Sequence, residues 1–140
     1  MGTQSTLLTP DLVNRRYPDL EILVTKEWVD NFFKTVDYKF PPGEELPHSF
    51  YGCLREMEFK VFADLGISLK QLLHVSQSFQ YFKHLKIGDR VISNVSIAKV
   101  MSRKLGGDLV TFLELKNTYT CRGEMYAIAE GTVIVRGIKE

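Results

Sequence analysis

The side chains of this chain best suited to acid–base, nucleophilic or metal chemistry are its three histidines and two cysteines. They are His48, His74, His84, Cys53 and Cys121. Neither cysteine lies in a C-x-x-C spacing, and together these residues form no metal constellation, so we expect no metal. His74 falls within a strand-patterned run and His84 beside a turn, where a sheet position and a solvent-facing position explain them. His48 directly precedes a helix-patterned segment, as either a site residue or a loop histidine hydrogen-bonded to backbone or water.

Two segments have the apolar spacing of amphipathic helices. The first begins after Thr25, whose hydroxyl suits an N-cap, and ends near Tyr38 because the pair of prolines that follows cannot continue a helix. The second covers Tyr51–Leu65 and ends at Gly66, a residue suited to the left-handed conformation after a helix. The loop PPGEELPHSF lies between them and carries His48.

Most of the remaining chain has the two-residue period of β-strands. One short apolar run, Leu20–Val24, precedes the first helix, and longer runs follow the second. These longer runs are Leu72–Lys83, Arg90–Arg103, Asp108–Cys121 and Met125–Arg136. Short turns containing glycine favour an antiparallel meander over a parallel sheet with crossovers. We therefore predict an α+β fold in which a curved antiparallel sheet wraps around the Tyr51–Leu65 helix. It spans residues 20–140 as a single domain, after a flexible lead-in of residues 1–19.

Composition argues against several classes of partner. Eighteen basic and seventeen acidic residues leave a net charge of +1, with no basic stripe, so we expect no nucleic-acid partner. No apolar run approaches the length of a membrane-spanning helix, and we expect no membrane partner. The first residues, MGTQSTLLTPDL, lack the basic and apolar regions of a secretory signal, so we expect a cytoplasmic location.

Four segments, in this order and spacing, resemble the MaoC-like hydratase and dehydratase family, above all its N-terminal-type, FAS1-like dehydratase domain. They are RRYPDLEILVTKEWVDNFFKTV, ADLGISLKQLLHVSQSF, QYFKHLKIGD and RGEMYAIAEGTVIVRG. The resemblance implies a hot-dog fold and a dimer, either a homodimer or a heterodimer with a catalytic hot-dog subunit. It also implies fatty-acid metabolism through interconversion of trans-2-enoyl and (3R)-hydroxyacyl thioesters. The substrate is an acyl thioester of coenzyme A or of acyl carrier protein, and no further cofactor is implied.

The same resemblance directs attention to a catalytic loop. Active members carry an Asp and a His within a Gly-Asp-x-Asn-Pro-x-His loop, where they act as base and acid. This chain has VDYKFPPGEELPHSFYG in that region, and its nearest candidates, Asp37 and His48, are eleven positions apart. Gly52 and Cys53 are candidate substrate-binding residues that could present backbone N–H groups to the thioester oxygen at the start of the central helix. Alternatively, Gly52 only permits tight packing, and Asp37 is a solvated carboxylate at a helix end.

These observations favour a non-catalytic or weakly catalytic subunit that completes a hydratase or dehydratase dimer and shapes its acyl channel. One alternative is a self-sufficient homodimer that uses Asp37 and His48 in a rearranged site. Another is an acyl-thioester binding or thioesterase-like module, for which Glu56 and Glu58 offer a carboxylate, although solvated helix charges explain both. An aromatic cluster is either core or the wall of an acyl tunnel; it comprises Phe32, Phe33, Phe59, Phe62, Phe79 and Tyr81.

Overall fold

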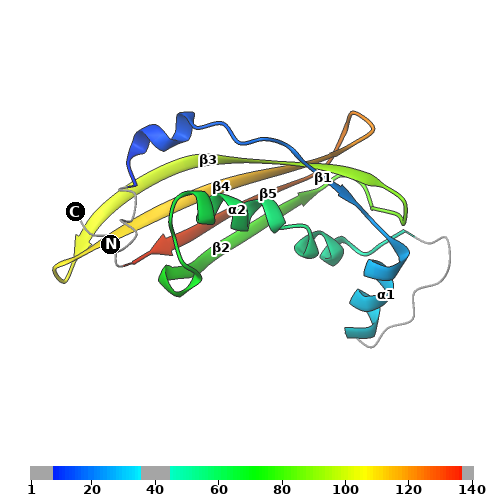
Figure 1. Cartoon of the computed structure of the whole chain (residues 1–140), viewed down its shortest axis with the longest axis horizontal. Coiled ribbons are helices and arrows are strands. Elements are labelled where there is room, and N and C mark those ends of the chain that lie inside the picture. Colours follow the sequence, from blue (N-terminus) through cyan, green and yellow to red (C-terminus); the bar gives the residue numbers. More distant parts are fainter. Residues whose placement is uncertain (1–7, 36–44, 137–140) are drawn as a thin grey trace.

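The computed structural model describes residues 8–35 and 45–136, which form one antiparallel sheet with a few short helices. The strands lie side by side in the order β1-β3-β4-β5-β2 (Figure 1). Their bounds are β1 (Leu20–Leu23), β2 (Leu72–Tyr81), β3 (Arg90–Leu105), β4 (Asp108–Cys121) and β5 (Glu124–Val135). Every neighbouring pair is antiparallel, which confirms the predicted α+β class. The strands β3, β4 and β5 form the predicted meander, whereas β2 pairs with β5 and not with β3. No helix within the described ranges is long and apolar enough to cross a membrane.

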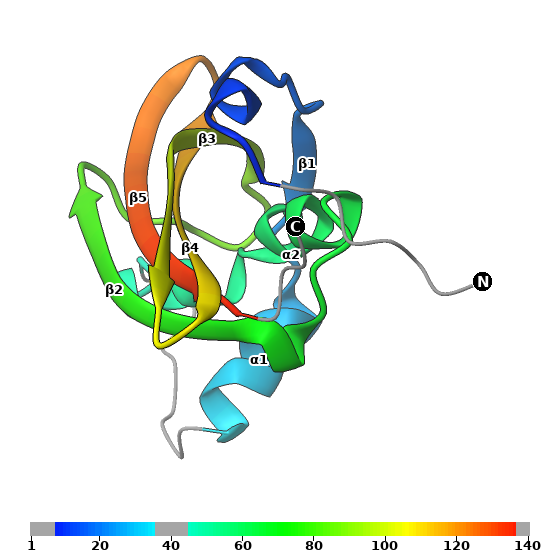
Figure 2. The same ribbon diagram turned by 90° about the vertical axis from the view of Figure 1, so that its left-hand side faces the viewer.

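The sheet curls around the central helix α2 (Glu56–Asp64), which lies inside its concave face (Figure 2). The apolar face of α2 packs on the sheet through Met57, Val61 and Phe62, all buried. β4 supplies the facing surface because Leu113, Leu115 and Tyr119 alternate inward along it, as its pattern predicted. The β4–β5 turn places Arg122 and Gly123 at φ 52° and 78°, the left-handed pair that a tight hairpin requires.

The predicted helix over Tyr51–Leu65 begins too early. Residues His48–Cys53 form a 3₁₀ helix, η2, and the α-helix begins only at Glu56. A tertiary contact explains the break, because the carbonyl oxygen of Leu54 accepts a hydrogen bond from the Tyr119 hydroxyl at 3.1 Å. The Glu58 N–H, which would complete an α-helical bond to Leu54, donates to Arg55 instead. At the other end, Gly66 has φ 72° and closes the helix as predicted.

The N-terminal helix α1 (Lys26–Thr35) begins as its sequence predicts. The Thr25 hydroxyl accepts a hydrogen bond from the Trp28 N–H at 3.1 Å, so it caps the helix. The short β1 strand before it pairs with β3 at one edge of the sheet. The predicted end of the helix near Tyr38 lies outside the described residues.

Part of the predicted lead-in packs against the domain. Residues 8–19, which we call the strap, contain the 3₁₀ helix η1 (Pro10–Asn14). Leu8 and Leu12 are buried in the same apolar cluster as α2, because burial of apolar surface offsets the entropy lost in ordering the segment. Residues 1–7 lie outside the described part of the chain.

β2 forms the other edge of the sheet. It pairs with β5 on one side only, after a short 3₁₀ helix, η3 (Leu69–Gln71). Two of its apolar side chains are exposed to solvent, Leu73 at 47% and Val75 at 52%. The register shifts between His74 and Ser76, so Val75 lies in a bulge. An edge strand with exposed apolar residues favours pairing with another chain.

Candidate functional site

His48 lies between two other rings rather than free in a loop. Its imidazole stacks on Tyr81 with ring centroids 4.2 Å apart and on His84 at 4.0 Å, both nearly parallel. Phe79 extends the stack beyond Tyr81 at 5.4 Å, and all four rings are half-buried. We call these residues the ring column. Because Phe79 and Tyr81 are on β2, the ring column joins the loop that carries His48 to the edge of the sheet.

Backbone contacts hold the ring column in place. The Nδ1 atom of His84 lies 2.8 Å from the carbonyl oxygen of Leu46, so Nδ1 carries the proton and donates it. The Tyr51 hydroxyl donates to the carbonyl oxygen of Lys83 at 2.8 Å. The prediction that His84 faces solvent was wrong, because the segment between β2 and β3 that carries it folds back over η2. The sequence did not reveal that His84 stacks on His48, because the two residues are remote in the chain.

The environment favours the neutral form of the His48 imidazole. Burial lowers its pKa, and the neighbouring His84 lowers it further, whereas Glu45 acts in the opposite direction. No described residue hydrogen-bonds to a ring nitrogen of His48, so the ring can act as an acceptor or base toward an added molecule. Its predicted partner, Asp37, lies outside the described residues, so the Asp37–His48 pairing stays a prediction.

Gly52 and Cys53 end η2 and precede the first turn of α2 instead of opening it. A Cβ atom at Gly52 would contact nothing within 4 Å, so close packing does not explain this glycine. Burial raises the pKa of the Cys53 thiol, which therefore is not an activated nucleophile. Cys53 does line an open cleft of about 410 Å³ between β1, α1 and the start of α2. Its other lining residues are Glu21, Ile22, Leu23, Trp28, Leu54 and Glu56.

A buried hydrogen-bond network joins the start of α2 to the sheet. Glu58 is 4% exposed, and its carboxylate accepts hydrogen bonds from Arg55 at 2.9 Å and from the Asn117 side chain at 3.1 Å. The same Asn117 amide donates to the Tyr119 hydroxyl at 2.9 Å and its oxygen accepts from Ser93 at 2.7 Å. We call this set, with the Leu54 carbonyl, the Glu58 network.

The Glu58 network corrects the prediction that both glutamates of α2 are solvated charges. Glu56 is exposed and lines the cleft, whereas Glu58 points into the core and is neutralised by Arg55. A carboxylate used in this way is not available to attack a thioester. The helical pattern alone did not distinguish the two, because their separation by two positions turns them to different sides of α2.

No cluster of His, Cys, Asp and Glu in the described ranges is suited to hold a metal ion. The predicted aromatic cluster divides into separate environments. Phe33 and Phe62 belong to the core, whereas Phe59 is 49% exposed on α2. Phe79 and Tyr81 form half of the ring column.

Comparison with protein families identifies the chain. Residues 43–129 match the family described as FAS1-like, dehydratase domain region. The chain belongs to this family. A search of curated proteins found no match. In this FAS1-like dehydratase domain, the matched region includes η2, α2 and all of the ring column.

Solved structures confirm the hot-dog fold of this FAS1-like domain. A chain of the HadBC (3R-hydroxyacyl-ACP dehydratase) complex from Mycobacterium tuberculosis is 21% identical, with TM-score 0.65 and coverage of 85% of this chain and 92% of that one. A chain of the ChsH1-ChsH2 complex from the same organism is 11% identical, with TM-score 0.65 and coverage of 89% and 85%. A MaoC-like dehydratase is 18% identical, with TM-score 0.67; the match covers 86% of this chain and 41% of that protein.

The two glutamates of α2 provide a matched test of the Glu58 network. We expect Glu58→Leu to lower the free energy of unfolding by roughly 2–4 kcal/mol, because Arg55 and Asn117 lose a buried acceptor. Glu56→Leu should change it by no more than about 0.5 kcal/mol, since that side chain is exposed. Urea denaturation of both variants measures the difference. Equal stabilities would contradict the assigned role of Glu58.

The ring column predicts a pH dependence of stability. The unfolded chain protonates His48 near its ordinary pKa of about 6.5, whereas the folded chain does so only at lower pH. The contribution of neutral His48 to the free energy of unfolding is therefore present above about pH 6.5. It is lost as the pH falls through the pKa of His48 in the folded chain. His48→Gln should flatten the acid side of the profile of unfolding free energy against pH. Identical slopes for wild type and His48→Gln would refute the assignment.

Proposed function

We propose that this chain is a non-catalytic or weakly catalytic subunit of a MaoC-like acyl-thioester hydratase or dehydratase. Such an enzyme interconverts trans-2-enoyl and (3R)-hydroxyacyl thioesters of coenzyme A or acyl carrier protein. The chain would pair with a second hot-dog chain that supplies the acid and base. The open edge of β2, where Leu73 and Val75 are about half exposed, carries this proposal.

The edge of β2 supports pairing because its backbone groups have a partner on one side only. A second hot-dog sheet placed along β2 would cover the exposed leucine and valine and continue the sheet. HadBC and ChsH1-ChsH2, which have the same fold, are complexes of different subunits. When this chain is purified alone, we expect the same edge to form a homodimer.

The residues around the cleft support a structural and binding role for this chain. The cleft at Cys53 ends at the start of α2, whose dipole favours a developing negative charge, whereas the carboxylates of Glu21 and Glu56 on the cleft wall oppose it. Trp28 and Leu54 offer apolar walls to an acyl group. Cys53 has a raised thiol pKa and Glu58 is neutralised, so neither supplies a base at this surface.

A self-sufficient homodimer is the second candidate. It is supported by the neutral, half-buried imidazole of His48, whose ring nitrogens remain free toward an added molecule within the described part of the chain. In that case His48 acts with Asp37, and the loop between them would bring the two side chains to one substrate. The thioesterase-like alternative loses support, because only the exposed Glu56 of its two candidates faces the cleft.

Hydration of crotonyl-coenzyme A by the isolated chain and by its complex with a catalytic hot-dog chain separates the two candidates. The partner-subunit proposal predicts activity only in the complex, with little change in His48→Ala. Robust turnover by the isolated chain, abolished in His48→Ala while the dimer persists, would establish the self-sufficient enzyme instead. Release of free thiol, rather than hydration, would indicate a thioesterase.

Two exposed leucines test the interface. We expect Leu73→Lys to weaken dimerisation by at least about tenfold, because the new charge would be buried beside the strand pairing. Leu105→Lys, beside the β3–β4 turn and 54% exposed, should leave the dimer unchanged. Native mass measurement over a dilution series reports both. A well-folded wild-type monomer at micromolar concentration would overturn the proposed assembly.

A further inference from the structure

The strap covers apolar core between β3 and α2 at the edge of the sheet opposite β2. Leu8 and Leu12 are 3% and 5% exposed and belong to the apolar cluster of Val61 and Phe62 on α2 and Val95 on β3. Figure 2 shows the segment along the β3 side of the curled sheet. Without these leucines, the space between helix and sheet would be an aliphatic groove at the surface.

Few directional contacts hold the strap down. Its backbone hydrogen bonds among the described residues are internal, from the Leu12 and Arg15 N–H groups to carbonyl oxygens within the strap. Its tether to α2 is at the surface, where Asp64 accepts hydrogen bonds from Arg15 at 2.8 Å and from the Tyr17 hydroxyl at 3.0 Å. The Arg15 and Asp64 side chains are 42% and 49% exposed, so water competes for this ion pair.

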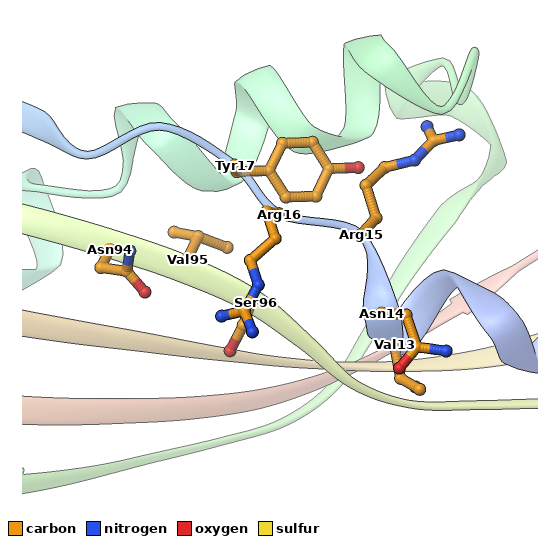
Figure 3. Close-up of a pocket in the computed structure, with 8 residues that line it drawn as sticks. All are labelled: Val13, Asn14, Arg15, Arg16, Tyr17, Asn94, Val95 and Ser96. Carbon is orange, nitrogen blue, oxygen red and sulfur yellow. The ribbon is translucent and has the colours of Figure 1, made fainter.

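The strap also leaves a gap against β3. A pocket of about 200 Å³ lies between them, and the core residue Val95 forms part of its wall. In Figure 3, Arg16 extends across β3 toward Ser96, whereas Arg15 points the opposite way. The remaining lining residues are Val13, Asn14, Tyr17 and Asn94. Polar residues form most of the lining, and Val95 links the pocket wall to the apolar cluster beneath the strap.

Charge at the mouth favours an anion. Arg15 is neutralised by Asp64, but Arg16 makes no ion pair with any described residue. A second acid beside the pocket, Asp19, accepts a hydrogen bond from the Asn94 amide at 2.6 Å. A carboxylate at the mouth would meet the Arg16 guanidinium and the Ser96 hydroxyl, both donors suited to bind it.

We propose that the strap is a displaceable cover over a binding site for a fatty acid, a linear alkyl chain that ends in a carboxylate. The carboxylate binds Arg16 at the mouth, and the alkyl chain replaces Leu8 and Leu12 in the groove between α2 and β3. An alkyl chain suits this groove because it restores the same apolar contacts that the two leucines make. The site is at the edge opposite β2, so it does not depend on the proposed thioester function.

Dodecanoate binding to the full chain, measured by calorimetry and by amide hydrogen exchange, tests the proposal. We expect saturable binding that speeds exchange of the Leu12 and Arg15 amides, because the bound chain displaces η1. Dodecanol and the Arg16→Gln variant should each reduce affinity by about tenfold, through loss of the charge-assisted contact. Lys34→Gln, an exposed cation on α1, is the matched control and should bind like wild type.

Asp64→Asn tests the cover because it weakens the tether of Arg15 and Tyr17. It also frees the Arg15 cation at the pocket, so amide exchange in η1, and not affinity alone, reports the cover. It should bind dodecanoate several-fold more tightly and show faster exchange in η1 before any ligand is added. Absence of binding, binding that leaves the Leu12 and Arg15 amides protected, or equal affinity in wild type and Arg16→Gln would each overturn the proposal. None of these measurements uses enoyl hydration, so failure here is distinct from failure of the partner-subunit proposal.

Discussion

The buried carboxylate of Glu58 is the constraint on which the rest of this structure depends. A charge in the core of a hot-dog domain is tolerated only when its hydrogen bonds are complete. Arg55 and Asn117 complete them, and Tyr119 extends the network to the carbonyl oxygen of Leu54. The helix α2 must therefore begin at one position and pack on β4 in one register.

That position determines the surroundings of both candidate binding regions. Because α2 begins at Glu56, the preceding residues form η2, and η2 brings His48 against the end of β2. The same helix start forms one wall of the cleft that contains Cys53. At the other end of α2, Asp64 holds the strap. One short helix thus connects the ring column, the cleft and the strap.

The two edges of the sheet have different physical character. β3 continues past β1 and is covered by the strap of the same chain, through apolar burial and surface hydrogen bonds. β2 has no such cover among the described residues and instead exposes apolar side chains. The asymmetry suits a domain that closes one edge by itself and presents the other to a partner chain.

The strands, their antiparallel pairing and the presence of both helices were predictable from the sequence, because their signals are local. The place of β2 beside β5 and the start of α2 were not. Alternating side chains predicted β4, and Thr25 and Gly66 predicted a helix start and a helix end that the structure confirms. Such features depend on neighbouring residues and backbone conformation. The family resemblance added the hot-dog arrangement.

The tertiary structure alone decided which of these residues meet. Nothing local distinguishes Glu58 from Glu56 or predicts that His84 stacks on His48, since their partners are distant in the chain. The burial of the two strap leucines is likewise not predictable from a polar N-terminal segment. The sequence determined the elements and their apolar faces. The site and the cover depend on long-range packing, which exists only once the sheet has closed around α2.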